Sequence, residues 1–310
     1  MGKTKVAVTA WMFGTGGGAA ELAEQGEVAE RIGFDSFWLP ESHFNGEISI
    51  PSPLMLLGAI SARTSKIKLG STSYLLPIRH PIQAAEEVAV LDRLSNGRVI
   101  LGVGRGFQDT MFTVFDVPIK DKRKRFKANL ETMIAAWQGD PVAEDADGKP
   151  AFLAPLPVQK PHPPIWVAAF GPLAIKQAGT LGLPYIASPM ETLDSLLDKY
   201  AQHKDHSENA GHGAIETTPV MRTLFISENK QLLDTVRENL NKEGMNRIRE
   251  QPADLDDWAI VGDSAYVRDK ISEYEEKLGL DYLIARGRIP GVDNETQIAS
   301  LEQLAKITSL

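Results

Sequence analysis

The sequence predicts an α/β fold and, within that class, a single (β/α)8 barrel of the TIM-barrel type. Two observations lead to this prediction: short apolar runs alternate with helical segments, and eight such units fit within 310 residues. Strands separated by helices pair in parallel through right-handed crossovers, which leaves an open doubly wound sheet or a closed barrel. Eight units favour the barrel, as one domain over residues 1–310, with insertions at 139–164 after the fourth helix and at 244–262 in the seventh unit.

The predicted strands come from short apolar runs bounded by turn residues. Val99, Ile100 and Leu101 show the pattern clearly, because they do not alternate with polar residues, which is typical of a strand buried on both faces. The predicted strands are residues 5–10, 36–39, 67–75, 98–103, 165–169, 185–187, 219–226 and 281–286.

The predicted helices come from apolar residues that recur every three to four positions. In the segment that follows His80, Val88, Leu91 and Leu94 share one face, and Pro81 stands in the first turn. The predicted helices are residues 19–32, 52–63, 81–95, about 121–138, 172–181, 191–206, 228–249, 263–278 and 295–308.

Composition excludes several classes of function. A net charge of −8 argues against a nucleic-acid partner, because phosphate backbones require a basic face. The local exception is a basic cluster, which we interpret as the solvated start of a helix, with a phosphate or polyanion site as the alternative. The cluster consists of Lys120, Lys122, Arg123, Lys124, Arg125 and Lys127.

The absence of cysteine removes disulfides, thiolate nucleophiles and thiolate metal sites. His203 and His206 are at helical spacing but lack a third ligand, so no metal site is expected. The first residues lack the apolar core of a signal peptide, and no stretch is apolar enough to span a bilayer. We therefore expect a cytoplasmic protein without a membrane partner.

The barrel prediction also indicates where chemistry belongs. Functional residues of such barrels follow the carboxyl ends of the strands. Four segments occupy such positions: Pro40 to Ile50, Thr72 to His80, Gly104 to Phe107, and Phe170 to Pro172.

Arg105 is the first candidate for ligand binding. It stands between Gly104 and Gly106 at a strand end, where the glycines allow close approach to the backbone and the guanidinium offers donors to a phosphate. An ion pair with an acidic residue of the chain is the structural alternative. Phe107 and Phe170, at two of the strand ends, are candidates for the wall of a pocket around a flat apolar ligand.

Glu41 and His43 are the candidates for proton transfer. They directly follow the strand at 36–39, and histidine exchanges protons near neutral pH. A histidine that caps or packs under the loop is the alternative. For His80, which precedes a proline and a helix, a fixing role in the loop is the stronger reading.

Taken together, these residues resemble the luciferase-like flavin-dependent monooxygenases. The resemblance covers nearly the whole chain. It rests on Gly33-Phe34-Asp35-Ser36-Phe37-Trp38-Leu39-Pro40-Glu41-Ser42-His43-Phe44, on Leu76-Pro77 through Arg105-Gly106-Phe107, on Pro163-Pro164-Ile165-Trp166-Val167-Ala168-Ala169, and on Gly182-Leu183-Pro184-Tyr185-Ile186.

The resemblance implies a reduced flavin mononucleotide (FMN) at the barrel mouth, supplied by a separate reductase, and transfer of oxygen from O2 to an organic substrate. It also implies a homodimer. Arg105 matches the arginine that holds the flavin phosphate, and the backbone near Phe107 matches part of the same site. Thr72-Ser73 matches the dipeptide beneath the flavin ring, where the family often has a cis peptide bond, and we predict that this bond is cis here.

Three departures from the family pattern concern the chemistry. Ser42 stands where true luciferases have their catalytic histidine, and Gly104 stands where they have a reactive cysteine, so light emission is not expected. Phe170-Gly171 replaces a Glu-Ser pair that helps to bind the phosphate. That half of the site must therefore use backbone amides from Gly171 onward or another side chain.

Two alternatives remain beside an FMN-dependent monooxygenase that acts on a small, largely apolar substrate. The same superfamily contains deazaflavin-dependent enzymes that transfer hydride. They often have threonine or serine in the turn after the fourth strand, so Arg105 favours ordinary flavin. The other alternative is a non-catalytic flavin-binding protein, since the luciferase histidine is absent.

Overall fold

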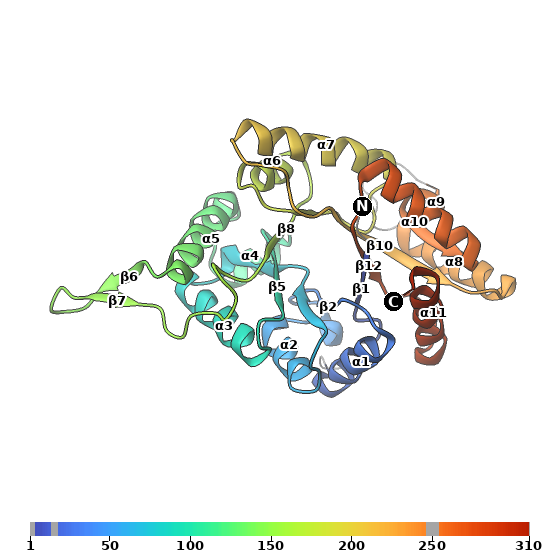
Figure 1. Cartoon of the computed structure of the whole chain (residues 1–310), viewed down its shortest axis with the longest axis horizontal. Helices are drawn as coiled ribbons and strands as arrows, with labels where there is room; N and C mark the ends of the chain where they lie inside the picture. The colour runs from blue at the N-terminus through green and yellow to red at the C-terminus, as the bar shows by residue number, and fades with distance from the viewer. Residues whose placement is uncertain (1–3, 14–17, 246–253, 310) are drawn as a thin grey trace. The chain divides into compact units, whose positions relative to one another are not determined.

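The computed structural model of the chain describes residues 4–13, 18–245 and 254–309 (Figure 1). Backbone contacts group the chain into two compact units. The first unit contains Met1–Met12, Gln25–Trp38 and Ala169–Leu310, and the second contains Phe13–Glu24 and Leu39–Ala168. We describe each unit by itself. That the chain forms one domain stays a prediction.

The strands of the first unit pair in parallel in the order β11, β10, β12, β1 and β2. Apolar runs explain this sheet, since all eight residues of β10 are buried. Their bounds are β1 Lys5–Thr9, β2 Ser36–Leu39, β10 Pro219–Ile226, β11 Ala259–Gly262 and β12 Tyr282–Arg286. A short strand, β9 (Tyr185–Ile186), lies beside β10, because the Tyr200 hydroxyl donates to the carbonyls of both Tyr185 and Pro219.

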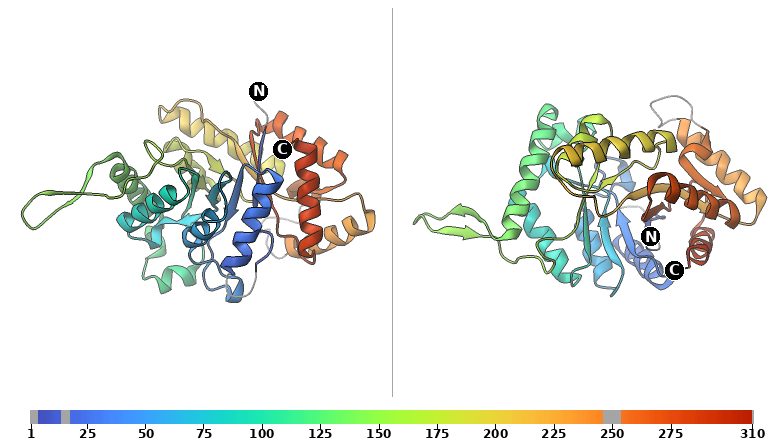
Figure 2. Two further views of the ribbon diagram at one scale, coloured as in Figure 1. Left: turned by 60° about the horizontal axis from the view of Figure 1, so that its bottom comes forward. Right: turned by 45° about the horizontal axis from the view of Figure 1, so that its top comes forward.

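The second unit contains the parallel strands β3, β5 and β8, with β4 also paired to β5. Their bounds are β3 Lys68–Ser71, β4 Tyr74–Leu75, β5 Val99–Gly104 and β8 Ile165–Ala168. An antiparallel hairpin of β6 (Pro141–Glu144) and β7 (Pro150–Phe152) projects away from the helices of the same unit in both views (Figures 1 and 2). The α/β class and the parallel pairing predicted from the sequence are therefore confirmed.

Helices separate the parallel strands in both units. In the second unit, helix α3 begins after His80 with Pro81 at its first position, as predicted. The helices are α1 Ala19–Ile32, α2 Pro53–Ser61, α3 Pro81–Leu94, α4 Asp109–Val114, α5 Lys122–Gln138, α6 Pro172–Thr180, α7 Leu193–Asn209, α8 Lys230–Met245, α9 Leu255–Trp258, α10 Ser264–Leu278 and α11 Asn294–Thr308.

The structure corrects the predicted count of eight strands. The segment predicted as an insertion at 244–262 contains α9 and a ninth parallel strand, β11, that pairs with β10. A four-residue apolar run directly after a helical turn carries no period of its own, which explains why it was missed. Residues 246–253, predicted in part as helix, lie outside the described residues.

Three further differences concern the second unit. The predicted strand 67–75 is divided into β3 and β4 by the dipeptide Thr72–Ser73. The segment 139–164 is a loop that contains the β6–β7 hairpin, and a short helix, α4, follows the turn after β5.

Each unit has its own apolar core. In the first unit Phe225 of β10 and Trp258 of α9 pack with Val236 and Leu240 of α8. In the second unit Leu75 packs with Met111, Phe112 and Val117, so a small core lies directly beside the ends of β4 and β5. Among the described residues, no helix is long and apolar enough to cross a membrane.

Candidate active site

The second unit brings most of the predicted site residues to the carboxyl ends of its strands. The Thr72 amide donates to the carbonyl of Leu39, the last residue of β2, at 2.8 Å. The Ser71 hydroxyl donates to the Gly102 carbonyl of β5, also at 2.8 Å. The segments that follow Leu39, Ser71 and Gly104 are therefore neighbours, as the barrel prediction requires.

Glu41 and His43 are in direct contact. His43 Nε2 lies 2.7 Å from Glu41 Oε1, and the side chains of Glu41 and His43 are 0% and 7% exposed. The other carboxylate oxygen of Glu41 accepts from the Leu75 amide at 2.9 Å. The four residues that follow β2 thus include a buried acid, which is bonded to the last residue of β4, and an imidazole in contact with that acid.

A third residue, Arg79, completes this cluster. Its Nη2 lies 2.8 Å from Glu41 Oε1, and its Nη1 donates to the Leu75 carbonyl at 2.7 Å. The guanidinium stacks on Tyr74, with Cζ 3.8 Å from the ring centroid. Sequence reasoning missed Arg79. One signal was available: Arg79 closely follows one predicted strand, and Glu41, which needs a counter-ion if it is buried, follows another.

The peptide bond between Thr72 and Ser73 is cis, which confirms the prediction made from the sequence. Gly104 lies against this dipeptide, because a Cβ on Gly104 would stand 2.8 Å from Ser73 Cβ and would also clash with Ser73 Oγ. The absence of a side chain at Gly104 is therefore required by packing. The cysteine that luciferases carry at this position has no room here.

Arg105 lies in a group of three cations. Burial lowers the pKa of Arg105, and the nearby charge of Arg123 lowers it further. Burial likewise lowers the pKa of Lys122, and the charge of Arg105 adds to this effect, while Asp109 opposes it. Lys122 Nζ also lies 3.4 Å from the carbonyl of Gly106. Arg105 and Lys122 are partly buried and Arg123 is exposed. A bound anion would relieve the mutual repulsion of these cations.

Aromatic side chains surround the imidazole of His43. Its ring centroid lies 5.1 Å from that of Phe115 and 5.9 Å from that of Phe44. Both phenylalanines are partly exposed, and Phe107 is 76% exposed. Phe44 and Phe115 provide an apolar surface beside the acid and the imidazole. Sequence reasoning had not singled out Phe115, and the predicted role of Phe107 in the wall of a pocket stays a prediction.

Phe170 and Gly171 belong to the first unit and are described there. Phe170 is exposed, and Lys199 Nζ lies 5.4 Å from its ring centroid. Gly171 caps α6 with φ of +85°, and a Cβ on it would meet no atom within 4 Å. Their predicted role in phosphate binding stays a prediction.

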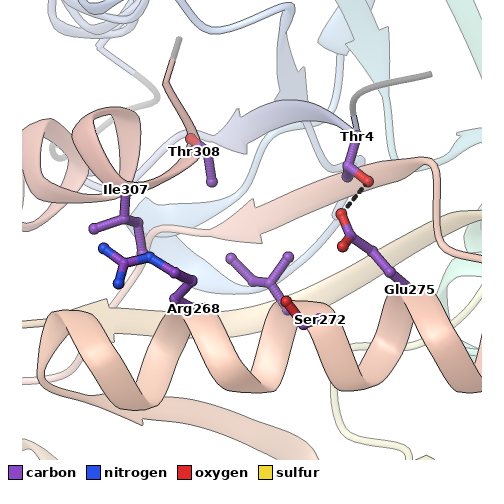
Figure 3. A pocket seen from close by; sticks show the side chains of 7 residues that line it. Thr4, Arg268, Ser272, Glu275, Ile307 and Thr308 are labelled. Atoms are coloured by element: carbon purple, nitrogen blue, oxygen red, sulfur yellow. Dashed lines mark hydrogen bonds between the residues drawn. The ribbon is translucent and has the colours of Figure 1, made fainter. Parts of the chain in front are cut away.

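A cavity of about 200 Å³ in the first unit lies away from these residues (Figure 3). Thr4, which precedes β1, lines it together with Arg268, Ser272 and Glu275 of α10. The Thr4 hydroxyl donates to the Glu275 carboxylate. None of the predicted site residues lines this cavity. Among the described residues, no group of acidic or histidine side chains is arranged to hold a metal ion.

Comparison with known proteins identifies the family. The model of the luciferase-like monooxygenases matches residues 6–281. The chain belongs to this family. The sequence of this chain is 29% identical over 191 residues to the oxygenase component of the flavin-dependent trigonelline monooxygenase of Acinetobacter baylyi. The match covers 59% of this chain and 52% of the relative, so it spans about half of the relative's length.

Two solved structures share the fold of this chain. The oxygenating constituent of 3,6-diketocamphane monooxygenase from Pseudomonas putida, in complex with FMN, superposes with a TM-score of 0.79 at 19% identity. An F420-dependent secondary alcohol dehydrogenase, in complex with an F420-acetone adduct, superposes with a TM-score of 0.80 at 17% identity. Each match covers 99% of this chain and 98% or 99% of the other. Proteins of this fold therefore include one in complex with FMN and one that is F420-dependent.

Proposed function

We propose that this chain is the oxygenase component of a two-component flavin-dependent monooxygenase. It would use reduced FMN and O2 to oxidise a small, largely apolar organic substrate. The observation that carries the proposal is the cationic group of Arg105, Lys122 and Arg123, which lies in the same unit as the cis dipeptide Thr72–Ser73.

The cationic group fits the phosphate of FMN. A phosphate monoester carries about 1.5 to 2 negative charges at neutral pH and accepts charge-assisted hydrogen bonds from arginine and lysine. Gly106, with φ of +70°, turns the backbone between Arg105 and Phe107. We assign the phosphate to Arg105 and Lys122, the flavin ring to the backbone at Thr72–Ser73, and an apolar contact to Phe107. Gly104 keeps the strand end narrow enough for Ser73 to lie against it.

Bound reduced FMN supplies the two electrons of the reaction, in which one oxygen atom of O2 enters the substrate and the other leaves as water. The chain has to exclude bulk water and move protons. His43 is suited to the proton step, because its ring is buried between Phe115 and Glu41. Glu41 holds the imidazole in place through Nε2, which leaves Nδ1 to exchange a proton.

The test is a comparison of FMN with riboflavin, which lacks the phosphate. Arg105→Ala should weaken FMN binding about 10- to 100-fold, because a hydrogen bond to a charged group contributes about 1.5–3 kcal/mol. Riboflavin binding should change less than about twofold, since nothing in it faces the lost charge. Isothermal titration and fluorescence quenching give both dissociation constants.

Lys204→Ala is the control for a general loss of positive charge. Lys204 lies exposed on α7 beside Glu208 at 3.8 Å, and its loss should leave both affinities unchanged. Equal losses for FMN and riboflavin in Arg105→Ala would remove Arg105 from the phosphate site. Oxygen uptake should be measured with reduced FMN and a panel of apolar substrates. If FMN binds but no substrate changes the rate of oxygen uptake, the chain is a non-catalytic flavin-binding protein.

Hydride transfer with the deazaflavin F420 is the second candidate. It is supported by the match in fold to the F420-dependent alcohol dehydrogenase. The same titration with F420 decides between them, since preference for F420 over FMN, together with reduction of F420 by an alcohol, would replace the monooxygenase proposal. The Acinetobacter relative is an oxygenase component, which supports a separate reductase as the electron source. A homodimer and a cytoplasmic location complete the proposal.

A further inference from the structure

Arg79 has no role in the function proposed above, yet it is bonded to the centre of the site. Glu41 has a side chain with 0% exposure, and an unpaired buried carboxylate costs several kcal/mol. Two hydrogen-bond donors meet the same carboxylate oxygen, Arg79 Nη2 at 2.8 Å and His43 Nε2 at 2.7 Å. One positive charge is enough to balance the carboxylate, so the two groups compete for that role.

We propose that Arg79 is a positioning residue for His43: it balances the buried Glu41 carboxylate and thereby leaves the His43 imidazole neutral, with Nδ1 as its proton acceptor. The proposal rests on the function assigned to His43 above. Arginine keeps its charge at any pH at which the protein is folded, whereas histidine does not. The Arg79–Glu41 pair is therefore neutral as a whole without a proton on His43.

The hydrogen bonds fix the tautomer of the imidazole. A carboxylate only accepts hydrogen bonds, so the hydrogen between His43 and Glu41 resides on Nε2. In a neutral imidazole the other nitrogen then carries the lone pair. Without Arg79, the charge of Glu41 would face His43 alone and would hold a second proton on the ring. The base would be lost over the pH range in which the ring stays charged.

The guanidinium is held so that it keeps its place. Its Nη1 donates to the Leu75 carbonyl, and its plane lies on the ring of Tyr74. The Tyr74 hydroxyl donates to Glu87 Oε2 of α3 at 2.7 Å, and burial raises the pKa of Tyr74, so that the phenol stays neutral. A chain of contacts therefore runs from α3 through Tyr74 and Arg79 to Glu41 and His43.

Among the described residues, Glu41 is the titratable group with a contact to His43, and Arg79 acts on His43 through Glu41. The partly exposed rings of Phe44 and Phe115 lie near the imidazole. Tyr74 and Glu87 stand behind Arg79. The two variants that change the balance of charge should thus shift the titration of His43 in opposite directions.

The experiment follows the His43 ring by nitrogen-15 NMR in the apoprotein, with the His43→Gln spectrum to assign the signal. In Arg79→Met, His43 should titrate about one pH unit higher than in the wild type, a tenfold change in proton affinity. In Glu41→Gln it should titrate lower, because the cation remains and the carboxylate does not. Arg79→Lys, which keeps the charge, should restore the wild-type titration in large part.

Arg93→Met is the matched control. Arg93 is exposed on α3 and donates to the Leu156 carbonyl at 2.9 Å, so its loss removes an arginine of the same helix region without touching Glu41. It should leave the His43 titration unchanged. Identical titrations in the wild type and in Arg79→Met would overturn the proposal. If Arg79→Met does not fold, Glu41→Gln decides, and the absence of a downward shift there overturns it.

The readout separates this inference from the proposed function. Because the apoprotein is used, the two opposite shifts test the role of Arg79 whether or not FMN binds. In the loaded enzyme, the acid limb of the pH profile for oxygen transfer should move up by about one unit in Arg79→Met while FMN affinity stays within about twofold. If the His43 titration shifts in the NMR experiment but the pH profile of oxygen transfer does not, Arg79 balances the charge of Glu41 but His43 is not the base. That result would refute the positioning role of Arg79.

Discussion

Each unit contains a buried ionic cluster of a glutamate, a cationic side chain and an aromatic ring, but the surroundings of the two glutamates differ. In the second unit Glu41 meets Arg79 and His43 after the carboxyl ends of strands. In the first unit Glu191 is 6% exposed and accepts from Lys199 and from the Tyr185 hydroxyl. Both clusters thus consist of a carboxylate, a cation and an aromatic neighbour.

The difference lies in what surrounds the carboxylate. Around Glu191, backbone and tyrosine groups hold the charged side chains: the Glu191 carboxylate accepts from the Ser188 amide at 2.8 Å, and the neighbouring Arg222, 0% exposed, donates to the Tyr274 hydroxyl at 2.8 Å. Around Glu41, the cluster includes an imidazole with one nitrogen outside the ionic contact and partly exposed rings beside it. We infer that the Glu191 cluster serves stability and the Glu41 cluster serves chemistry.

The largest effect that tests this contrast is expected at Glu191. Glu191→Ala leaves Lys199 without its buried partner and should lower the free energy of unfolding by about 3–5 kcal/mol. Urea denaturation followed by circular dichroism measures the loss. Oxygen transfer per folded molecule and the His43 titration should not change. A variant with wild-type stability would show that the Glu191 cluster is energetically neutral, and the contrast would then fail.

The next effect is expected at the strand end beside the site. Gly104→Ala places a Cβ against Ser73 and should destabilise the chain by about 1–3 kcal/mol, as overpacking of a dense region does. Gly213→Ala is the control, because a Cβ there meets no atom within 4 Å. The double change Gly104→Ala with Ser73→Gly removes the clash and should recover most of the loss. A Gly104→Ala variant as stable as the control would show that this strand end is loosely packed.

The sequence predicts much of the fold because the spacing of apolar residues indicates which side chains are buried, and each spacing is typical of one kind of element, helix or strand. β10 and α1 lie at the predicted residues 219–226 and 19–32, since long apolar or amphipathic patterns leave little choice. The short strand β11 was beyond that reasoning, because four buried residues carry no period, and so was the interruption that divides the predicted strand 67–75 into β3 and β4. The cis bond at Thr72–Ser73 came from family resemblance, since no propensity favours it.

The sequence predicts a site residue when its own type and its direct neighbours indicate its role. It does not predict contacts between side chains from segments that are far apart in the sequence. Arg105 stands out in the sequence because glycines flank it. The Arg79–Glu41 contact joins residues from two loops, and only the fold brings the cation within 2.8 Å of the carboxylate. Phe115 was missed for the same reason, because α4 places it beside His43.

The smallest expected effect concerns His203, whose ring centroid lies 5.9 Å from that of Tyr185 in the Glu191 cluster. His203 is 3% exposed on α7, and its Nε2 lies 2.8 Å from the Leu183 carbonyl. Burial lowers the pKa of His203 below its ordinary 6.5, while the hydrogen bond to Leu183 partly opposes this. As pH falls, the unfolded chain therefore takes up the proton before the folded chain does. The free energy of unfolding decreases below about pH 6.5 until the folded pKa is passed, and above about pH 6.5 His203 does not change it.

His203→Gln keeps a donor to the Leu183 carbonyl and should remove this part of the pH dependence of stability. Urea denaturation between about pH 8 and about pH 5 measures the change. Oxygen transfer should keep its wild-type pH profile in His203→Gln, whereas changes at Arg79 move that profile. A shift of the activity profile in His203→Gln would show that the two clusters are coupled, and their division into one for stability and one for chemistry would have to be abandoned.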